Sequence, residues 1–293
     1  MVSTELLAQQ VINGISIGSW LFLVAVGLSL IFGVLGVLNF AHGALFMIGA
    51  YVTIVVIGAV DSFWLGVVLA TLVVGAVGML IEMGFIRQLY GRAEEELDQL
   101  LMTFAFVLII TDSIRAIFGS GSVVTNPPNA LRGGIGLVGG YGIGTYRAFL
   151  ILASVAVMGA ILLALRSTNF GRLVRATSSD RDMALLLGID VPRLYTLVFF
   201  VGAAMAGLGG ALITPIQSLT PELGNQVIIN AFVVVVIGGL GSFTGAFVGA
   251  YLIGIMIAVG SIYAAGAGQL FPFIALIVIL LIRPEGLFGG IDS

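Results

Sequence analysis

The chain contains few side chains that could carry out covalent chemistry. His42 is its single histidine, it has no cysteine, and all eleven of its positively charged residues are arginines. These absences exclude disulfides, thiolate nucleophiles and metal sites built from cysteine or clustered histidine. A Walker-A phosphate-binding loop needs a lysine, so a second chain would have to bind any ATP that this protein uses. The residues predict no catalytic group, no metal site and no cofactor bound by this chain.

Two polar residues, Asn39 and His42, interrupt the apolar stretch GLSLIFGVLGVLNFAHGALFMIGAY (27–51). Three glycines before Asn39, at positions 27, 33 and 36, are expected to loosen the helix. Polar side chains at membrane depth usually face a bundle interior or a solute pathway, and a broken helix exposes ends that can meet a zwitterionic solute. Alternatively, Asn39 caps a new helix and His42 bonds to a neighbouring carbonyl group. Both interpretations stay open.

A second candidate site is a short helix expected at 179–188, within the charged segment 166–193. Ser179 can cap it, with Asp182 in the capping-box position. Acidic residues in the first turn suit the helix dipole, and Gly188 can end the helix. The apolar face of the helix consists of Met183, Leu186 and Leu187.

A helix of about two turns is marginal in water on its own, so its apolar face needs a partner. That partner is either a cytoplasmic protein on which the helix docks, or the protein's own bundle or the lipid surface. The sequence favours neither.

The third candidate is the interruption in VVVVIGGLGSFTGAFVGAY (233–251). Glycines at 238, 239 and 241 predict a break near a membrane face. The break is either a tight turn between two spans or a half-helix beside a pathway. Gly239 and Gly241 are therefore candidate pathway residues.

The elements that position these residues are membrane-spanning helices. The chain has 293 residues, 60% hydrophobic and 9% charged, whereas a soluble domain has roughly 45–50% apolar and 25% charged residues. The apolar runs do not alternate as the strands of a membrane barrel would. We predict an all-α, polytopic transmembrane bundle of about eight to ten spans, forming a single domain over residues 1–293. The apolar segments are 6–31, 34–60, 64–86, 98–118, 146–165, 194–216, 224–239, 242–263 and 269–283.

The arginine bias of short loops predicts the orientation. With nine spans and the C-terminus inside, eight of the eleven arginines lie on the cytoplasmic side. The N-terminus is then periplasmic, the loop around 119–145 forms an irregular external surface, and the loop 166–193 is cytoplasmic. Asp112 and Arg115 are expected to pair on one helix, and Glu82 is expected to reach the membrane interface near the inner end of its span.

Four segments together resemble the LivH-type permease subunit of branched-chain amino acid ABC importers. They are GLSLIFGVLGVLNFAHGALFMIGAY, GRLVRATSSDRDMALLLGID, VVVVIGGLGSFTGAFVGA and the closing RPEGLFG (283–289). The resemblance extends from about residue 8 to 290 in the same order and spacing.

This resemblance implies a permease of the bacterial inner membrane that works by alternating access. Its partners would be a second, LivM-type permease, two cytoplasmic ATPase subunits that hold ATP and Mg, and a periplasmic substrate-binding protein. The motif match adds Gly43 to Asn39 and His42 as candidate pathway residues. The residues implied to couple the chain to an ATPase are Gly171, Arg172, Arg175, Ala176, Asp180, Ala184, Leu187, Gly188 and Ile189.

Other functions fit the sequence less well. The urea-type subunit tends to read NMAHGE where this chain reads NFAHGA (39–44), which favours an amino acid over urea, an amide or an aromatic carboxylate. A self-sufficient secondary carrier would need buried ionisable residues, which are scarce. An intramembrane enzyme would need a nucleophile–base pair or metal ligands at membrane depth.

Overall fold

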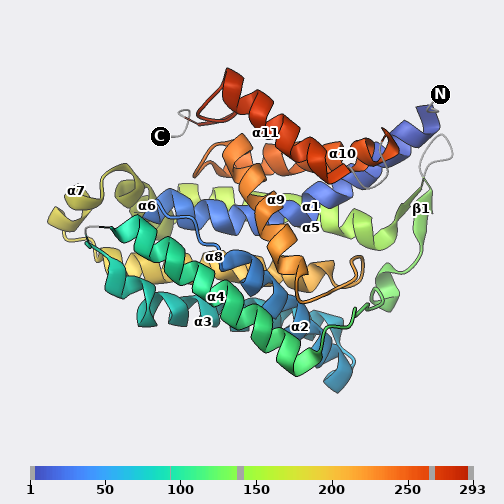
Figure 1. The fold of residues 1–293 in the computed structure, drawn as a ribbon, viewed down its shortest axis with the longest axis horizontal. Helices are drawn as coiled ribbons and strands as arrows, with labels where there is room; N and C mark the ends of the chain where they lie inside the picture. Colours follow the sequence, from blue (N-terminus) through green and yellow to red (C-terminus); the bar gives the residue numbers. More distant parts are fainter. Residues whose placement is uncertain (1–3, 93, 137–141, 264–267, 290–293) are drawn as a thin grey trace.

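The computed structural model describes residues 4–92, 94–136, 142–263 and 268–289, and helices dominate these ranges (Figure 1). The predicted all-α bundle is confirmed. The α-helices are α1 (Thr4–Leu35), α2 (His42–Val60), α3 (Phe63–Gly84), α4 (Glu95–Phe118), α5 (Thr145–Ser167), α6 (Asn169–Ser179), α7 (Arg181–Leu186), α8 (Val191–Ile213), α9 (Leu223–Gly238), α10 (Phe243–Tyr263) and α11 (Phe271–Ile282). The short elements are the 3-10 turns η1 (Ile86–Leu89), η2 (Asn129–Leu131) and η3 (Gly268–Leu270) and the strands β1 (Gly134–Gly136) and β2 (Gly142–Gly144).

Seven of these helices are long and apolar enough to cross a bilayer: α1, α2, α3, α4, α5, α8 and α10. Helices α9 and α11 are apolar but shorter. Within the described residues, each of the nine predicted segments corresponds to one apolar helix, and seven of these helices are long enough to span a membrane, against the eight to ten spans predicted.

Helices α1 and α8 form the centre of the bundle and are its most buried spans. Helix α1 packs along α10, and a Cβ atom on Gly14 would lie only 2.5 Å from Ile255 Cα. Helix α8 packs along α3 in the same way, through glycines on both helices. Small residues allow such close backbone approach in membranes, where apolar side chains gain little by leaving lipid. Helices α4 and α5 lie at the periphery.

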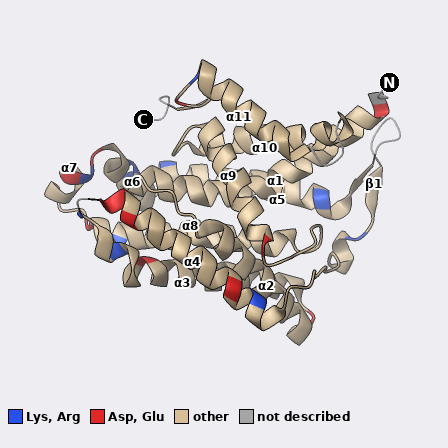
Figure 2. Cartoon of the chain, viewed as in Figure 1, with Lys and Arg blue, Asp and Glu red and all other residues tan. Residues whose placement is uncertain are grey.

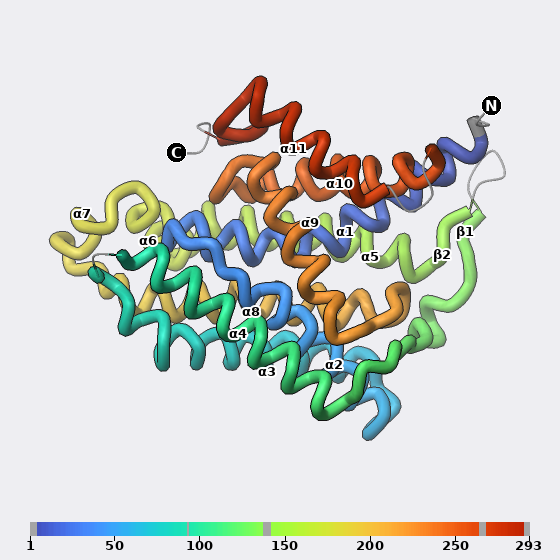
Figure 3. The backbone as a smooth tube through the Cα atoms, viewed as in Figure 1, coloured from blue at the N-terminus to red at the C-terminus, as the bar shows by residue number. Residues whose placement is uncertain are grey.

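The chain breaks between α1 and α2, at residues 36–41, and turns back into the bundle before α2 begins (Figure 3). Gly36 adopts φ +74° and ends α1. The expectation that Gly27 and Gly33 loosen the helix is wrong, since both lie inside α1. Their missing side chains instead admit Gly202 of α8 and Gly241, respectively.

The two ends of the bundle differ. The start of α1 lies beside the β1–β2 hairpin, and Gln9 Nε2 donates to Gly142 O at 3.0 Å, whereas α7 lies at the far end (Figure 1). Charged residues gather toward these ends and leave the middle of the bundle mostly uncharged (Figure 2). The expected external loop 119–145 contains η2 and this two-stranded hairpin; its residues 137–141 lie outside the described part.

Candidate functional site

Helix α6 is braced against the end of α5 by two of the residues expected to couple the chain to an ATPase. The Thr168 hydroxyl caps α6 by accepting from Gly171 N at 3.2 Å. A Cβ atom on Gly171 would lie 2.5 Å from the carbonyl carbon of Leu165, so only glycine fits this corner. Arg175 donates to Leu165 O. Gly171 and Arg175 therefore fix the angle between α5 and α6.

The cap of α7 differs by one residue from the prediction. Ser179 is the last residue of α6, and Asp180 is the N-cap, whose carboxylate accepts from Met183 N at 2.9 Å. Because α6 continues through Ser179, Asp180 is the first extended residue, with φ −156° and ψ 106°. An aspartate caps a helix as well as a serine does.

The predicted stop at Gly188 is confirmed. Gly188 adopts φ +84°, its N–H donates to Leu185 O, and Ile189 N–H donates to Ala184 O, both at 3.0 Å. This pair of bonds is the Schellman arrangement, in which a left-handed residue satisfies the last carbonyl groups of a helix. Asp180 and Gly188 thus define α7 at its two ends.

The outer face of α7 carries large apolar side chains. Leu186 is 82% exposed and Leu187 is 75% exposed, while Met183 is half-exposed. Ala184 is buried, and Ile189 packs partly against the core. Arg172 and Ala176 lie on the exposed side of α6, where Arg172 donates to Asn169. The residues expected to couple the chain to an ATPase therefore include some that anchor α6 and α7 to the bundle, some on the exposed side of α6, and some at the exposed apolar tip of α7.

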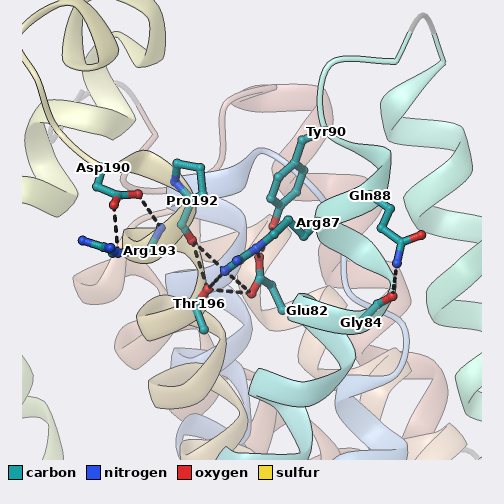
Figure 4. Close-up of polar contacts among 9 residues, drawn as sticks. All are labelled: Glu82, Gly84, Arg87, Gln88, Tyr90, Asp190, Pro192, Arg193 and Thr196. Atoms are coloured by element: carbon teal, nitrogen blue, oxygen red, sulfur yellow. Dashed lines mark hydrogen bonds and ion pairs between the residues drawn. The ribbon is translucent and has the colours of Figure 1, made fainter.

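A buried carboxylate, Glu82, lies in the last turn of α3 (Figure 4). The expectation that Glu82 reaches the interface is wrong, because its side chain is fully buried. It accepts from Arg87 Nε and Nη2, each at 3.3 Å, from Tyr90 Oη at 3.1 Å and from Thr196 Oγ1 at 2.7 Å. A buried charge is tolerated when it is paired and hydrogen-bonded in this way. Burial and the adjacent carboxylate raise the pKa of Tyr90, so its hydroxyl stays protonated and donates.

The break at 36–41 holds the second predicted set. His42 Nε2 lies 3.0 Å from Val24 O of α1, and Phe40 N donates to Thr103 Oγ1 of α4 at 3.4 Å. Asn39 and His42 are buried, and neither Asn39 Oδ1 nor His42 Nδ1 has a hydrogen-bond partner among the described residues. The structure thus brings polar atoms with unused hydrogen-bonding capacity to one place inside the bundle.

Gly43 and the pair Gly239–Gly241 occupy different places. Gly43 opens α2 and faces Gly224 at the start of α9, with no room for a side chain. Gly239 and Gly241, at φ +107° and +82°, form the turn between α9 and α10. Residues 286–289 close over that turn: Leu287 N donates to Ile237 O at 2.8 Å. The turn itself is tight, whereas α9 is shorter than a membrane span, so the half-helix beside a pathway stays a prediction.

Two hollows of about 340 and 290 Å³ share Arg147 and Ile216 at the end opposite α7. Arg147 Nη1 donates to Asn13 Oδ1 at 2.7 Å. Among the described residues, no carboxylate pairs with Arg147, unlike the expected and observed ion pair of Arg115 with Asp112 at 2.9 Å. A cationic side chain that lines such a hollow can hold a carboxylate.

Comparison with known proteins gives consistent relatives. The family model described as branched-chain amino acid transport system / permease component matches residues 10–282. The high-affinity branched-chain amino acid transport system permease protein LivH of Escherichia coli K12 is 32% identical over 96% of this chain and 95% of its own length. The corresponding protein BraD of Pseudomonas aeruginosa is 29% identical over the same shares. The probable LivH of Methanocaldococcus jannaschii is 30% identical over 92% of this chain and 88% of its own. No solved structure matches.

The match spans every apolar helix, the break at 36–41 and the α6–α7 segment, so it covers the whole bundle described above. The chain belongs to the branched-chain amino acid transport system permease component family.

Proposed function

We propose that this chain is the permease subunit of an ATP-binding cassette importer that moves branched-chain or related amino acids across the bacterial inner membrane. The observation that carries the proposal is the family match over residues 10–282 of a bundle with seven helices long enough to span a membrane. The relatives' names support the substrate class.

The complex would contain a second, LivM-type permease, two cytoplasmic ATPases that bind ATP and Mg, and a periplasmic substrate-binding protein. The absence of lysine from the chain supports the assignment of ATP to a partner. The exposed apolar tip of α7, formed by Leu186 and Leu187, would seat on an ATPase. ATP binding and hydrolysis would displace α7, and the helices would open the pathway to alternate sides.

In this orientation the α7 end and the C-terminus face the cytoplasm, and the N-terminus faces the periplasm. The hollow around Arg147 then lies on the periplasmic side, where solute is delivered. Asn39 in the break and His42 and Gly43 at the start of α2 lie inside the bundle and are the candidate pathway residues. Because the chain has no cysteine, single cysteines at Val124 or Leu187 report sidedness through a membrane-impermeant maleimide: Val124 should label from the periplasm and Leu187 only after lysis.

The direct test is purification of the complex in mild detergent and reconstitution into proteoliposomes. ATP-dependent uptake of radiolabelled leucine, with an ATPase and a second permease in the preparation, is the expected result. Leu186→Asp should weaken ATPase association by tenfold or more, as burying a charge at an interface core does, whereas the control Val124→Asp at the opposite end should not. Uptake by this chain alone without ATP would replace the proposal with a secondary carrier.

A further inference from the structure

The carboxylate of Glu82 joins two helices that are far apart in sequence. It lies in the last turn of α3, and it accepts a hydrogen bond from Thr196 of α8 at 2.7 Å (Figure 4). Its ion-pair partner Arg87 also reaches α8, since Arg87 Nη2 donates to Pro192 O at 3.3 Å and contacts the Thr196 hydroxyl. These contacts therefore join the end of α3 to the start of α8, the helix that follows α7 in the chain.

Arg181, the first residue of α7, connects α7 to the neighbouring segments. Its guanidinium carbon lies 5.8 Å from the ring centre of Tyr90 and 5.6 Å from that of Tyr195. Its Nη1 lies 3.5 Å from Glu95 Oε1 at the start of α4. Such stacking uses the flat guanidinium, which an ammonium group does not reproduce. One side chain thus holds α7 to the segment after η1, to α8 and to α4.

Tyr90 contacts both Arg181 and Glu82. Its ring stacks against Arg181 and meets Tyr195 edge to face, with ring centres 5.2 Å apart, while its hydroxyl donates to Glu82 at 3.1 Å. A continuous set of contacts therefore runs from α7 through Arg181 and Tyr90 to Glu82. By contrast, Leu186 and Leu187 on the outer face of α7 are left for the partner.

We propose that Arg181, Tyr90 and Glu82 are positioning residues that make α7 one rigid unit with α3, α4 and α8, so that a displacement of α7 by the ATPase moves these helices together. The movement of these helices by the ATPase rests on the proposed function, whereas the rigid attachment of α7 does not depend on transport. Helices α3 and α8 share an extensive interface, so motion delivered to their ends is carried along both.

The first test measures rigidity. Two spin labels on an otherwise cysteine-free chain, at Asp182 of α7 and Leu80 of α3, give the distribution of distances between these helices in the purified complex. We expect a narrow distribution that keeps its mean with and without ATP. Arg181→Ala should widen it, Arg181→Lys should restore it in part, and the control Arg92→Ala should leave it narrow. Arg92 is a suitable control because its ion pair with Asp98 lies on the exposed surface nearby.

The second test measures coupling in proteoliposomes. Arg181→Ala should keep ATP hydrolysis within about twofold and lower leucine uptake per ATP by about tenfold. Tyr90→Phe keeps the ring and removes only the hydroxyl that reaches Glu82, so it avoids the folding defect that Glu82→Ala could cause. We expect a smaller loss of uptake per ATP, of about threefold.

An unchanged distance distribution and unchanged uptake per ATP in Arg181→Ala would overturn the inference. If the wild-type complex shows no ATP-driven uptake, the proposed function fails, while the distance measurement still decides whether α7 is rigidly held.

Discussion

Gly43 offers the clearest separation of a packing role from a solute-contact role. It is the second residue of α2, and its backbone lies against Gly224 at the start of α9. A Cβ atom on Gly43 would fall well inside contact distance of Gly224 O and 2.7 Å from Ile228 Cβ, whereas ordinary contact begins at 3.4 Å. Gly43→Ala must therefore push α9 away by at least about 0.7 Å, since neither obstacle is the end of a flexible side chain.

The expected cost follows from this overlap. Forcing one extra carbon into a packed core costs about 1–3 kcal/mol. Gly58 lies on the same helix with nothing within 4 Å of its virtual Cβ, so Gly58→Ala should be neutral or gain up to about 1 kcal/mol from helix propensity. The two alanine variants should therefore shift the stability of the transporter in opposite directions. Each kcal/mol corresponds to a change of about 2–4 °C in melting temperature for chains of about 150–250 residues, and to no more than that for this longer chain.

The assay is thermal unfolding of the purified transporter in detergent, followed by tryptophan fluorescence, together with leucine uptake. Gly224→Ala meets Gly43 O at 2.6 Å from the other side, so the double variant should cost less than the sum of the single ones. A melting temperature for Gly43→Ala at or above that of Gly58→Ala, with a raised half-saturating leucine concentration, would refute the packing account and favour solute contact at Gly43.

Two further predictions concern the ends of the bundle. Gly188→Ala should destabilise the end of α7 by about 1–2 kcal/mol, because only glycine adopts φ +84° without strain, whereas Gly188→Asn should cost less. Hydrogen exchange at the amides of residue 188 and Ile189 measures this, and equal exchange in both variants would contradict it. The Arg115 guanidinium, 2.8 Å from Glu222, lowers the pKa of that carboxyl by hydrogen bonding. The stabilisation of the folded state by this pair is therefore present above the ordinary glutamate pKa of 4.5 and is lost as the pH falls through the lowered pKa. Glu222→Gln should remove this acid-side dependence of the melting temperature, and an unchanged pH profile would show that the pair contributes nothing.

The helices and the ends of α7 could be predicted because their signals are local. Apolar runs long enough to span a bilayer became the spans, and Gly188 became the left-handed stop that its place after Leu187 predicted. The cap was misplaced by one residue because Ser179 and Asp180 are both good caps. The choice between them depended on where α6 ended, and the cap pattern alone does not contain that information.

The buried cluster could not be predicted because its contacts join distant segments. Glu82 meets Thr196 across 114 residues and Arg181 meets Glu95 across 86. The local signal, a single carboxylate ending an apolar run five residues before Arg87, fits an exposed interface residue equally well. The glycines before Asn39 were misread for the same reason. Gly27 and Gly36 both stand in the same apolar run, so the sequence does not distinguish them. Gly27 packs against the neighbouring helix α8, whereas Gly36 ends α1.

The α7 end of the bundle and the break between α1 and α2 differ in their polar contacts. At the α7 end, the buried carboxylate of Glu82 accepts from Arg87 and Tyr90, which follow α3, and from Thr196 of α8. Separating α3 from α8 would remove the Thr196 donor from a buried charge, and the cost of that loss resists the separation. At the break, Asn39 Oδ1 and His42 Nδ1 have no partner among the described residues, so a rearrangement there sacrifices no hydrogen bond of these two atoms. An alternating-access permease needs both properties. One end must be stiff enough to receive a displacement from outside, and the interior must contain polar atoms that are free to form new hydrogen bonds. We therefore expect the break between α1 and α2 to change conformation during transport, while the contacts of Glu82 persist.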